Sequence, residues 1–153
     1  KGYENFSPKR IILDKNLDIG LNTYIFKSAK KNNTIIFHNS SNNSKIKILK
    51  NKKILLIKSR LDNKKRFILN LIFKRLFSLG IRNLLIEGGD KITRYILIHR
   101  LANQFYLFKS PKNLLRNKKS VIFTSYSILK KNYKVKSKII TKLAKDNITI
   151  YKR

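Results

Sequence analysis

The chain has 153 residues, a formal net charge of +30 and a hydrophobic content of 42%. This hydrophobic content excludes a disordered chain, and no apolar run approaches the roughly 20 residues that a membrane span needs. The absence of cysteine excludes disulfides, thiolate metal sites and cysteine nucleophiles. The chain also contains no methionine, so we expect it to be a fragment or a processed product.

The positive charge has two explanations. Basic residues can neutralise nucleic-acid phosphates and release their counterions, which favours a nucleic-acid-binding protein. Alternatively, the abundance of lysine, isoleucine and asparagine reflects A/T-rich codons. The lysines are spread from Lys9 to Lys152 without an interleaved aromatic pattern, which favours codon bias. In either case we expect nonspecific attraction of polyanions.

Short apolar runs in the first half of the chain predict strands separated by polar turns. The predicted strands are Lys9–Asp14, Thr34–His38, Lys45–Leu49 and Ile54–Ile57, with a Ser/Asn loop over residues 39–44. The clearest helix runs from Asp62 to Leu79, because apolar residues recur there at helical spacing. Asp62 is its expected N-cap and Gly80 its expected C′ residue.

The second half begins with a predicted strand at Leu84–Ile86 and a helix from Asp90 to Leu101. With the preceding helix, this gives the strand–helix–strand order of a parallel sheet. Later strands are predicted at Gln104–Phe108, Val121–Phe123, Tyr133–Ile140 and Asn147–Tyr151, with a basic loop over residues 111–119. No repeat or linker divides the chain, so we expect one α/β domain over residues 1–153 with late antiparallel strands.

The strongest candidate site is the glycine turn between the predicted strand Leu84–Ile86 and the helix that starts at Asp90. Unpaired N–H groups at a helix start attract anions, and glycine lets a phosphate approach the backbone closely. Glu87 stands just before the two glycines, where open α/β sheets place ligand contacts, and a structural salt bridge is its alternative role. Asp90 is expected to cap the helix. Thr93 and Arg94 lie in its first turn, close to any bound phosphate.

Other kinds of site have less support in the sequence. The two histidines, His38 and His99, have no Asp or Glu nearby at ligand spacing, so we expect no metal site. The chain also lacks the Gly-x-Ser-x-Gly elbow of hydrolases and the Walker loop of nucleotide triphosphatases. The glycine turn therefore remains the main candidate.

The order of several motifs resembles a known enzyme family. These motifs are an apolar strand led by proline and closed by aspartate, a helix that ends in Leu-Gly, a Glu-Gly-Gly turn after an apolar strand, and an alternating last strand. They stand here at Pro8–Asp14, Leu79–Ile81, Leu84–Gly89 and Asp146–Tyr151, with Thr34–Phe37, Leu101–Gln104 and Pro111 between them. Over nearly its whole length the chain resembles the C-terminal reductase domain of the bifunctional riboflavin-biosynthesis deaminase/reductase.

The resemblance implies a dihydrofolate-reductase-like α/β fold. That fold is a three-layer sandwich with a mostly parallel central sheet and antiparallel C-terminal strands. The family's first strand and its zinc deaminase domain come before the position of Lys1. We therefore expect this chain to lack both, and to carry an incomplete pocket and an exposed sheet edge.

The resemblance also implies NADPH-dependent reduction of 5-amino-6-(5-phosphoribosylamino)uracil to its ribityl product. In the family the glutamate of the Glu-Gly-Gly motif, here Glu87, contacts this phosphorylated aminouracil. The following turn and helix start hold NADPH, and they map to Gly89, Asp90, Lys91, Ile92, Thr93, Arg94 and Tyr95. No residue is assigned as the catalytic acid. The chain departs from the family at Asn103-Gln104, commonly Asp-Glu, and at Lys15, where a small hydroxyl residue often contacts the cofactor.

More than one function class therefore stays open. The first is the NADPH-dependent reductase, for which a homodimer is expected. We expect it in the cytoplasm, because the start of the chain shows no signal peptide. The second is a highly basic, ribosome-associated nucleic-acid-binding protein without enzymatic activity. A third is a relative of the same fold that acts on another pteridine or pyrimidine.

Overall fold

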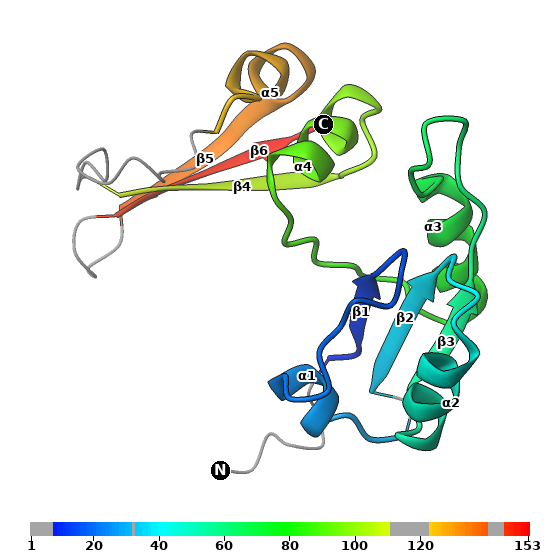
Figure 1. The fold of residues 1–153 in the computed structure, drawn as a ribbon. Coiled ribbons are helices and arrows are strands. Elements are labelled where there is room, and N and C mark those ends of the chain that lie inside the picture. Colours follow the sequence, from blue (N-terminus) through cyan, green and yellow to red (C-terminus); the bar gives the residue numbers. More distant parts are fainter. Residues whose placement is uncertain (1–7, 32, 111–122, 141–145) are drawn as a thin grey trace, which may run out of the picture. The chain divides into compact units, whose positions relative to one another are not determined.

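The computed structural model describes residues 8–31, 33–110, 123–140 and 146–153. The chain divides into two compact units, Lys1–Leu84 and Leu85–Arg153. Each unit has its own three-stranded sheet and its own helices, which are labelled in Figure 1. The two units are described one after the other.

The first unit contains a parallel sheet in the order β1-β2-β3. Its strands are β1 (Arg10–Leu13), β2 (Thr34–His38) and β3 (Leu55–Lys58). The central strand β2 is buried along its whole length, which explains why it reads as a continuous apolar run and not as an alternating one. The predicted strands at these three places are confirmed.

Three helices complete the first unit: α1 (Tyr24–Lys27), α2 (Asn43–Asn51) and α3 (Leu69–Ser78). The core on one side of the sheet joins Ile36 of β2, Leu49 of α2 and Ile54, with Phe26 of α1 packed against them. Helix α3 buries an apolar face at helical spacing through Leu69, Ile72 and Leu76.

The predicted strand at Lys45–Leu49 is wrong, because these residues form the middle of α2. Asn42 is the N-cap, and its side-chain oxygen accepts a hydrogen bond from the backbone N–H of Lys45 at 3.0 Å. Ile46 and Leu49 lie three residues apart and both pack into the core, whereas Ile48 is exposed. The alternation of lysine and isoleucine is compatible with a helix, and the Asn42 cap stabilises the helix start.

Asp62 does not cap α3, which begins at Leu69, seven residues later than predicted. Instead the Asp62 carboxylate closes a tight turn. It accepts hydrogen bonds from the backbone N–H groups of Lys64 and Arg66 at 2.9 and 2.8 Å, and it pairs with the Arg66 guanidinium at 2.7 Å. A single antiparallel bridge between Leu61 and Phe67 holds this turn. An aspartate satisfied locally in this way has no reason to start a helix.

The end of α3 agrees with the prediction. Gly80 has φ +81, the left-handed conformation that glycine adopts without strain. The N–H of Gly80 donates to the carbonyl of Phe77 at 3.0 Å, and the N–H of Ile81 donates to that of Leu76 at 3.1 Å. This pair of bonds is a Schellman motif.

The predicted strand at Leu84–Ile86 is wrong. These residues form no strand, and their three side chains are exposed. A strand needs a neighbour to satisfy its N–H and C=O groups, and neither three-stranded sheet includes this segment. The apolar run alone could not reveal whether such a neighbour is present.

The second unit contains an antiparallel sheet in the order β4-β6-β5. Its strands are β4 (Gln104–Lys109), β5 (Lys134–Ile140) and β6 (Asn147–Lys152), with an irregularity in β5 between Val135 and Ser137. They confirm three predicted strands and the antiparallel character of the end of the chain. The basic loop over 111–119 and residues 121–122 of the predicted strand 121–123 lie outside the described residues.

Two helices pack with this sheet: α4 (Asp90–Ile98) and α5 (Tyr126–Asn132). Their core joins Leu97 of α4, Leu129 of α5, Tyr133 and Tyr151 of β6. Figure 1 shows both helices close to the three strands of their unit. Helix α4 starts at the predicted residue and ends three residues early, while α5 was not predicted.

Candidate functional site

The glycine turn leads directly into α4, as the sequence indicates. Gly89 is the N-cap residue with extended backbone angles, φ −70 and ψ 173, and it makes no side-chain cap. Its carbonyl accepts a hydrogen bond from the N–H of Thr93 at 3.2 Å. No described residue accepts a hydrogen bond from the backbone N–H groups of Asp90, Lys91 or Ile92. These three donors, together with the helix dipole, favour an anion at this end.

The two glycines differ in what surrounds them. A Cβ added to Gly88 would collide with the side chain of Ile92, so this glycine is required by packing within the turn. A Cβ added to Gly89 would meet no atom of the described residues within 4 Å. The φ of Gly89 is one that any residue adopts. Neither the backbone nor its neighbours therefore explain Gly89, and the open space fits the close approach of a ligand.

The charged side chains around this turn are accessible. Glu87 is exposed and makes no ion pair or hydrogen bond with any described residue. A structural salt bridge was the alternative role expected for Glu87, and no described Lys or Arg forms an ion pair with it. Lys91 and Arg94 are exposed in the first turns of α4. An acidic group thus precedes the glycines and two cations follow them.

Asp90 is the first residue of α4 and not its cap, which corrects the predicted role. Its carboxylate turns to the start of α5. Oδ2 accepts a hydrogen bond from the hydroxyl of Thr124 at 2.7 Å, and Oδ1 accepts one from the hydroxyl of Ser125 at 3.3 Å. Ser125 is fully buried. The Asp90 side chain therefore joins two helices and leaves its own backbone N–H free.

The remaining predicted cofactor residues are half-buried on α4. They are Ile92, Thr93 and Tyr95. Ile92 is the side chain that excludes a Cβ at Gly88. The ring of Tyr95 lies 4.2 Å from that of His99, centre to centre, with the planes tilted by 41°. These side chains pack along α4, while the exposed Glu87, Lys91 and Arg94 around its start are accessible to a ligand.

The first unit holds a second cluster of polar residues, at the carboxyl ends of its parallel strands. The Asp14 carboxylate accepts hydrogen bonds from the N–H groups of Asp18 and Ile19, both at 2.8 Å, which fixes the loop after β1. The Asn39 side chain donates to the carbonyl of Ser59 at 2.8 Å and so joins the segments after β2 and β3. Lys15 takes part through its carbonyl, which accepts from the N–H of Asn39 at 2.9 Å.

His38 ends β2 at this edge and is only 4% exposed. Its Nδ1 atom is buried and has no hydrogen-bond partner in the described residues. Burial lowers the pKa of the His38 imidazole below 6.5, and the nearby Lys58 ammonium lowers it further. Carboxyl ends of parallel strands are the usual ligand edge of open α/β sheets. The order of the parallel strands would have indicated that His38 and Asn39 lie at this edge, whereas the sequence pattern assigned them no ligand role.

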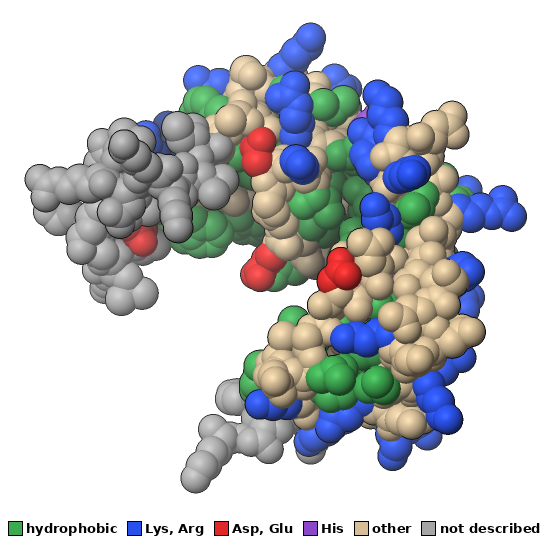
Figure 2. All heavy atoms as spheres, in the orientation of Figure 1, with side chains coloured by type: hydrophobic (Ala, Val, Ile, Leu, Met, Phe, Trp, Pro, Cys, Tyr) green, Lys and Arg blue, Asp and Glu red, His purple; other side chains and the backbone are tan. Residues whose placement is uncertain are grey.

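Basic side chains are spread widely over the surface. On the face seen in Figure 2, Lys and Arg side chains are scattered among hydrophobic and uncharged atoms and are not gathered in one patch. No group of three or more His, Asp or Glu side chains in the described ranges could hold a metal ion. None of the helices in those ranges has the length and apolarity to cross a bilayer.

Comparisons with known proteins find relatives in riboflavin biosynthesis. A curated relative, the riboflavin biosynthesis protein RibD of Aquifex aeolicus (strain VF5), is 26% identical over 148 residues. The match covers 95% of this chain and 39% of that protein, so the chain spans about two fifths of its length.

Solved structures agree on the fold. A pyrimidine reductase-like protein of Corynebacterium diphtheriae matches with a TM-score of 0.69 and 16% identity, over 95% of this chain and 60% of that one. RibD of Acinetobacter baumannii matches with a TM-score of 0.69 and 17% identity, over 95% and 37% of the two chains. The predicted α/β fold class is confirmed. The family described as RibD C-terminal domain matches residues 1–149, and the chain therefore belongs to that family.

Proposed function

We propose that the chain is a reductase domain of riboflavin biosynthesis that uses NADPH to reduce 5-amino-6-(5-phosphoribosylamino)uracil to its ribityl product. The observation that carries the proposal is the open start of α4. There the unsatisfied N–H groups of Asp90, Lys91 and Ile92 follow a glycine that nothing within the described chain requires. Family membership supplies the class of reaction.

The residues at the start of α4 fit the diphosphate of a dinucleotide. Backbone N–H groups at a helix N-terminus bind phosphate oxygens, and the open space at Gly89 lets them come close. The exposed Lys91 and Arg94 add positive charge at the same end. Thr93, one turn from Gly89, offers a hydroxyl on the same helix.

Glu87 is proposed to bind the substrate. A carboxylate accepts hydrogen bonds from N–H and O–H groups, and an aminouracil with a ribosyl chain offers several of both. Glu87 stands two residues before Gly89, so a substrate held by its carboxylate lies close to a dinucleotide held by the helix start. NADPH, when bound, supplies the hydride. The contribution of the chain is to hold the donor and acceptor carbons in reacting geometry.

A steady-state assay of the full chain tests this proposal. NADPH oxidation is followed with the phosphorylated aminouracil as substrate, for wild type and for Glu87→Gln. The variant removes a charge from an exposed side chain without partners, so its thermal stability should equal that of wild type. Loss of two charge-assisted hydrogen bonds should lower kcat/KM by about 100-fold while NADPH affinity stays constant. Equal kcat/KM for the two proteins would refute the substrate role of Glu87.

A further inference from the structure

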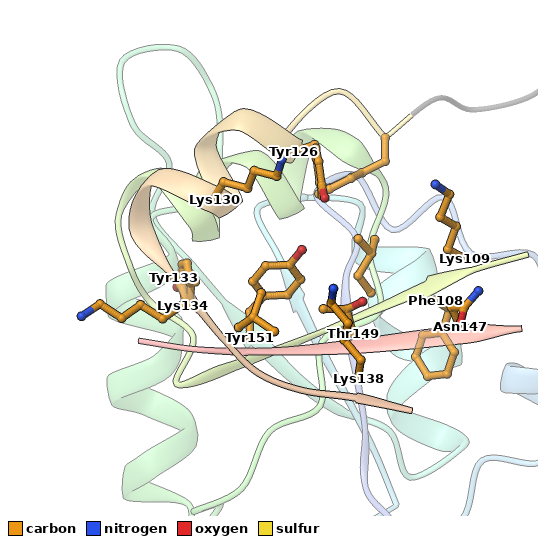
Figure 3. A pocket seen from close by; sticks show the side chains of 13 residues that line it. Phe108, Lys109, Tyr126, Lys130, Tyr133, Lys134, Lys138, Asn147, Thr149 and Tyr151 are labelled. Atoms are coloured by element: carbon orange, nitrogen blue, oxygen red, sulfur yellow. The ribbon is translucent and has the colours of Figure 1, made fainter. Parts of the chain in front are cut away.

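The second unit contains a cavity of about 1070 Å³ between α5 and the sheet β4-β6-β5. Drug-sized and cofactor-sized ligands occupy pockets of roughly 300–1,000 Å³, so this one is large enough for a nucleotide-sized molecule. Figure 3 shows Tyr126 and Lys130 on α5, with the Lys130 side chain directed toward Tyr126, and Tyr151 and Thr149 on β6. None of the residues from Glu87 to Tyr95 lines this cavity.

The cavity has an unusual charge distribution. Lys109, Lys130, Lys134 and Lys138 line it, and no Asp or Glu of the described residues does. Across the described residues the ion pair found is Arg66–Asp62, so none of these four lysines is neutralised by a carboxylate there. Lysines that face one concave space repel each other, and an anion bound between them relieves this repulsion.

Neutral hydrogen-bonding groups accompany the lysines. Asn147 and Thr149 of β6 line the cavity and can donate to an oxyanion. The Tyr151 hydroxyl donates a hydrogen bond to the Tyr126 oxygen, and this bond lowers the pKa of Tyr126. Burial raises the pKa of Tyr151, and the same hydrogen bond raises it further. The Lys130 ammonium lies 4.6 Å from the centre of the Tyr126 ring, and this cation–π contact holds it beside that ring.

The rest of the lining is apolar. Leu107 of β4, Phe123 in the segment before α5, and Val135 of β5 contribute side chains to it. A free phosphate ion would leave these side chains in contact with water. A ligand with an organic body would cover them and gain the hydrophobic contribution of that area.

We propose that this cavity binds a small phosphorylated organic molecule of nucleoside monophosphate size. Its phosphate lies among Lys109, Lys130 and Lys138, and its ring or sugar lies on the apolar lining. In Figure 3 the Lys134 side chain extends away from the other lining groups, so it is not assigned to the phosphate. The proposal concerns a site separate from the start of α4 and does not depend on the reductase activity.

Calorimetric titration of the full chain with uridine 5′-monophosphate tests the proposal. At physiological salt, saturable binding with a Kd of about 1 mM or tighter is expected. Inorganic phosphate and uridine should each bind at least about tenfold more weakly, because each offers only half of the complementary groups. Equal affinity for phosphate and for the nucleotide would overturn the assignment of the apolar lining.

A matched pair of double variants separates the site from the general charge of the protein. Lys130→Gln with Lys138→Gln changes the cavity, while Lys131→Gln with Lys136→Gln removes the same charge at exposed neighbouring positions that do not line it. The first pair should weaken nucleotide binding by about tenfold or more, and the second by less than about twofold. Equal weakening by both pairs would show binding by net charge and refute the site. Displacement of the bound nucleotide by NADPH would also refute it, because the two ligands are assigned to different places.

Discussion

Replacing Asp90 by alanine removes the carboxylate that joins the starts of α4 and α5. The buried Ser125 hydroxyl then loses its acceptor at 3.3 Å, which costs about 1–2 kcal/mol. The exposed Thr124 hydroxyl loses a bond of 2.7 Å, worth about 0.5 kcal/mol in contact with water. Loss of a negative charge in the first turn of α4 costs about 0.5 kcal/mol more. The sum is about 2–3 kcal/mol.

Hydrogen exchange followed by mass spectrometry measures this loss locally. Peptides that cover α4 and α5 should both exchange faster in Asp90→Ala, because the carboxylate stabilises both helices. Asp90→Asn keeps an oxygen acceptor and should lose about half as much protection. Lys91→Ala is the control and should leave protection unchanged, because the Lys91 side chain is exposed and makes no hydrogen bond or ion pair with the described residues. Faster exchange in α4 alone, or an equal effect of Asn and Ala, would refute the assigned role.

Three further predictions concern the end of α3, the buried histidine and the core of the second unit. Gly80→Ala should destabilise the first unit by about 1 kcal/mol in urea unfolding, because alanine is strained at φ +81. A Cβ there meets no atom within 4 Å, so the left-handed backbone is the whole cost, and an unchanged midpoint would contradict this. The pKa of His38 is lowered in the folded chain, so the unfolded chain binds the proton more tightly; stability should be constant above pH 7 and fall as the pH drops below 6.5, by at most about 1.4 kcal/mol per pH unit. His38→Gln should remove that decline, and a parallel decline in the variant would assign it to other groups. Leu97→Ala removes a fully buried side chain and should cost about 2–5 kcal/mol in the second unit, and a loss below 1 kcal/mol would contradict its place in that core.

Local sequence patterns predicted most of the elements whose structure is determined by their own residues. The strand Thr34–His38 was predicted with its observed bounds, because a strand buried on both faces has a continuous apolar run, here Ile35–Phe37. Gly80 marked the end of α3, because the left-handed residue of a Schellman motif favours glycine. Asp90 indicated the start of α4, because acidic residues favour the first turn of a helix. Its side chain accepts a hydrogen bond from Thr124 and does not cap the helix.

The errors arose where structure depends on a partner that spacing does not reveal. Lys45–Leu49 alternates like a strand, but the capping bond from Asn42 and the burial of Leu49 select a helix. Leu84–Ile86 has the composition of a strand, yet no described strand pairs with it. The short helix α5 has few apolar residues, and its main contacts are with α4 and β6, so its sequence alone carries little signal.

The candidate site could be predicted only in part. The glycines and Glu87 were identifiable from the sequence, because the start of a helix and a preceding carboxylate are local features. The contrast between Gly88 and Gly89 was not, because it depends on where the Ile92 side chain lies. The edge that holds Asp14, His38 and Asn39 depends on the order of the parallel strands, which a single sequence does not state.

The affinity of the full chain for NADPH, measured for wild type and Gly89→Ala, tests the account most directly. The added methyl group meets no described atom, so the variant should fold with wild-type stability, but the methyl would occupy the space assigned to the diphosphate. Gly20→Ala, at an exposed glycine whose Cβ would lie 3.4 Å from Thr23, is the control. We predict that wild type and Gly20→Ala bind NADPH equally and that Gly89→Ala binds at least about tenfold more weakly. Wild-type affinity in a folded Gly89→Ala protein, or no NADPH binding by wild type, would contradict the account.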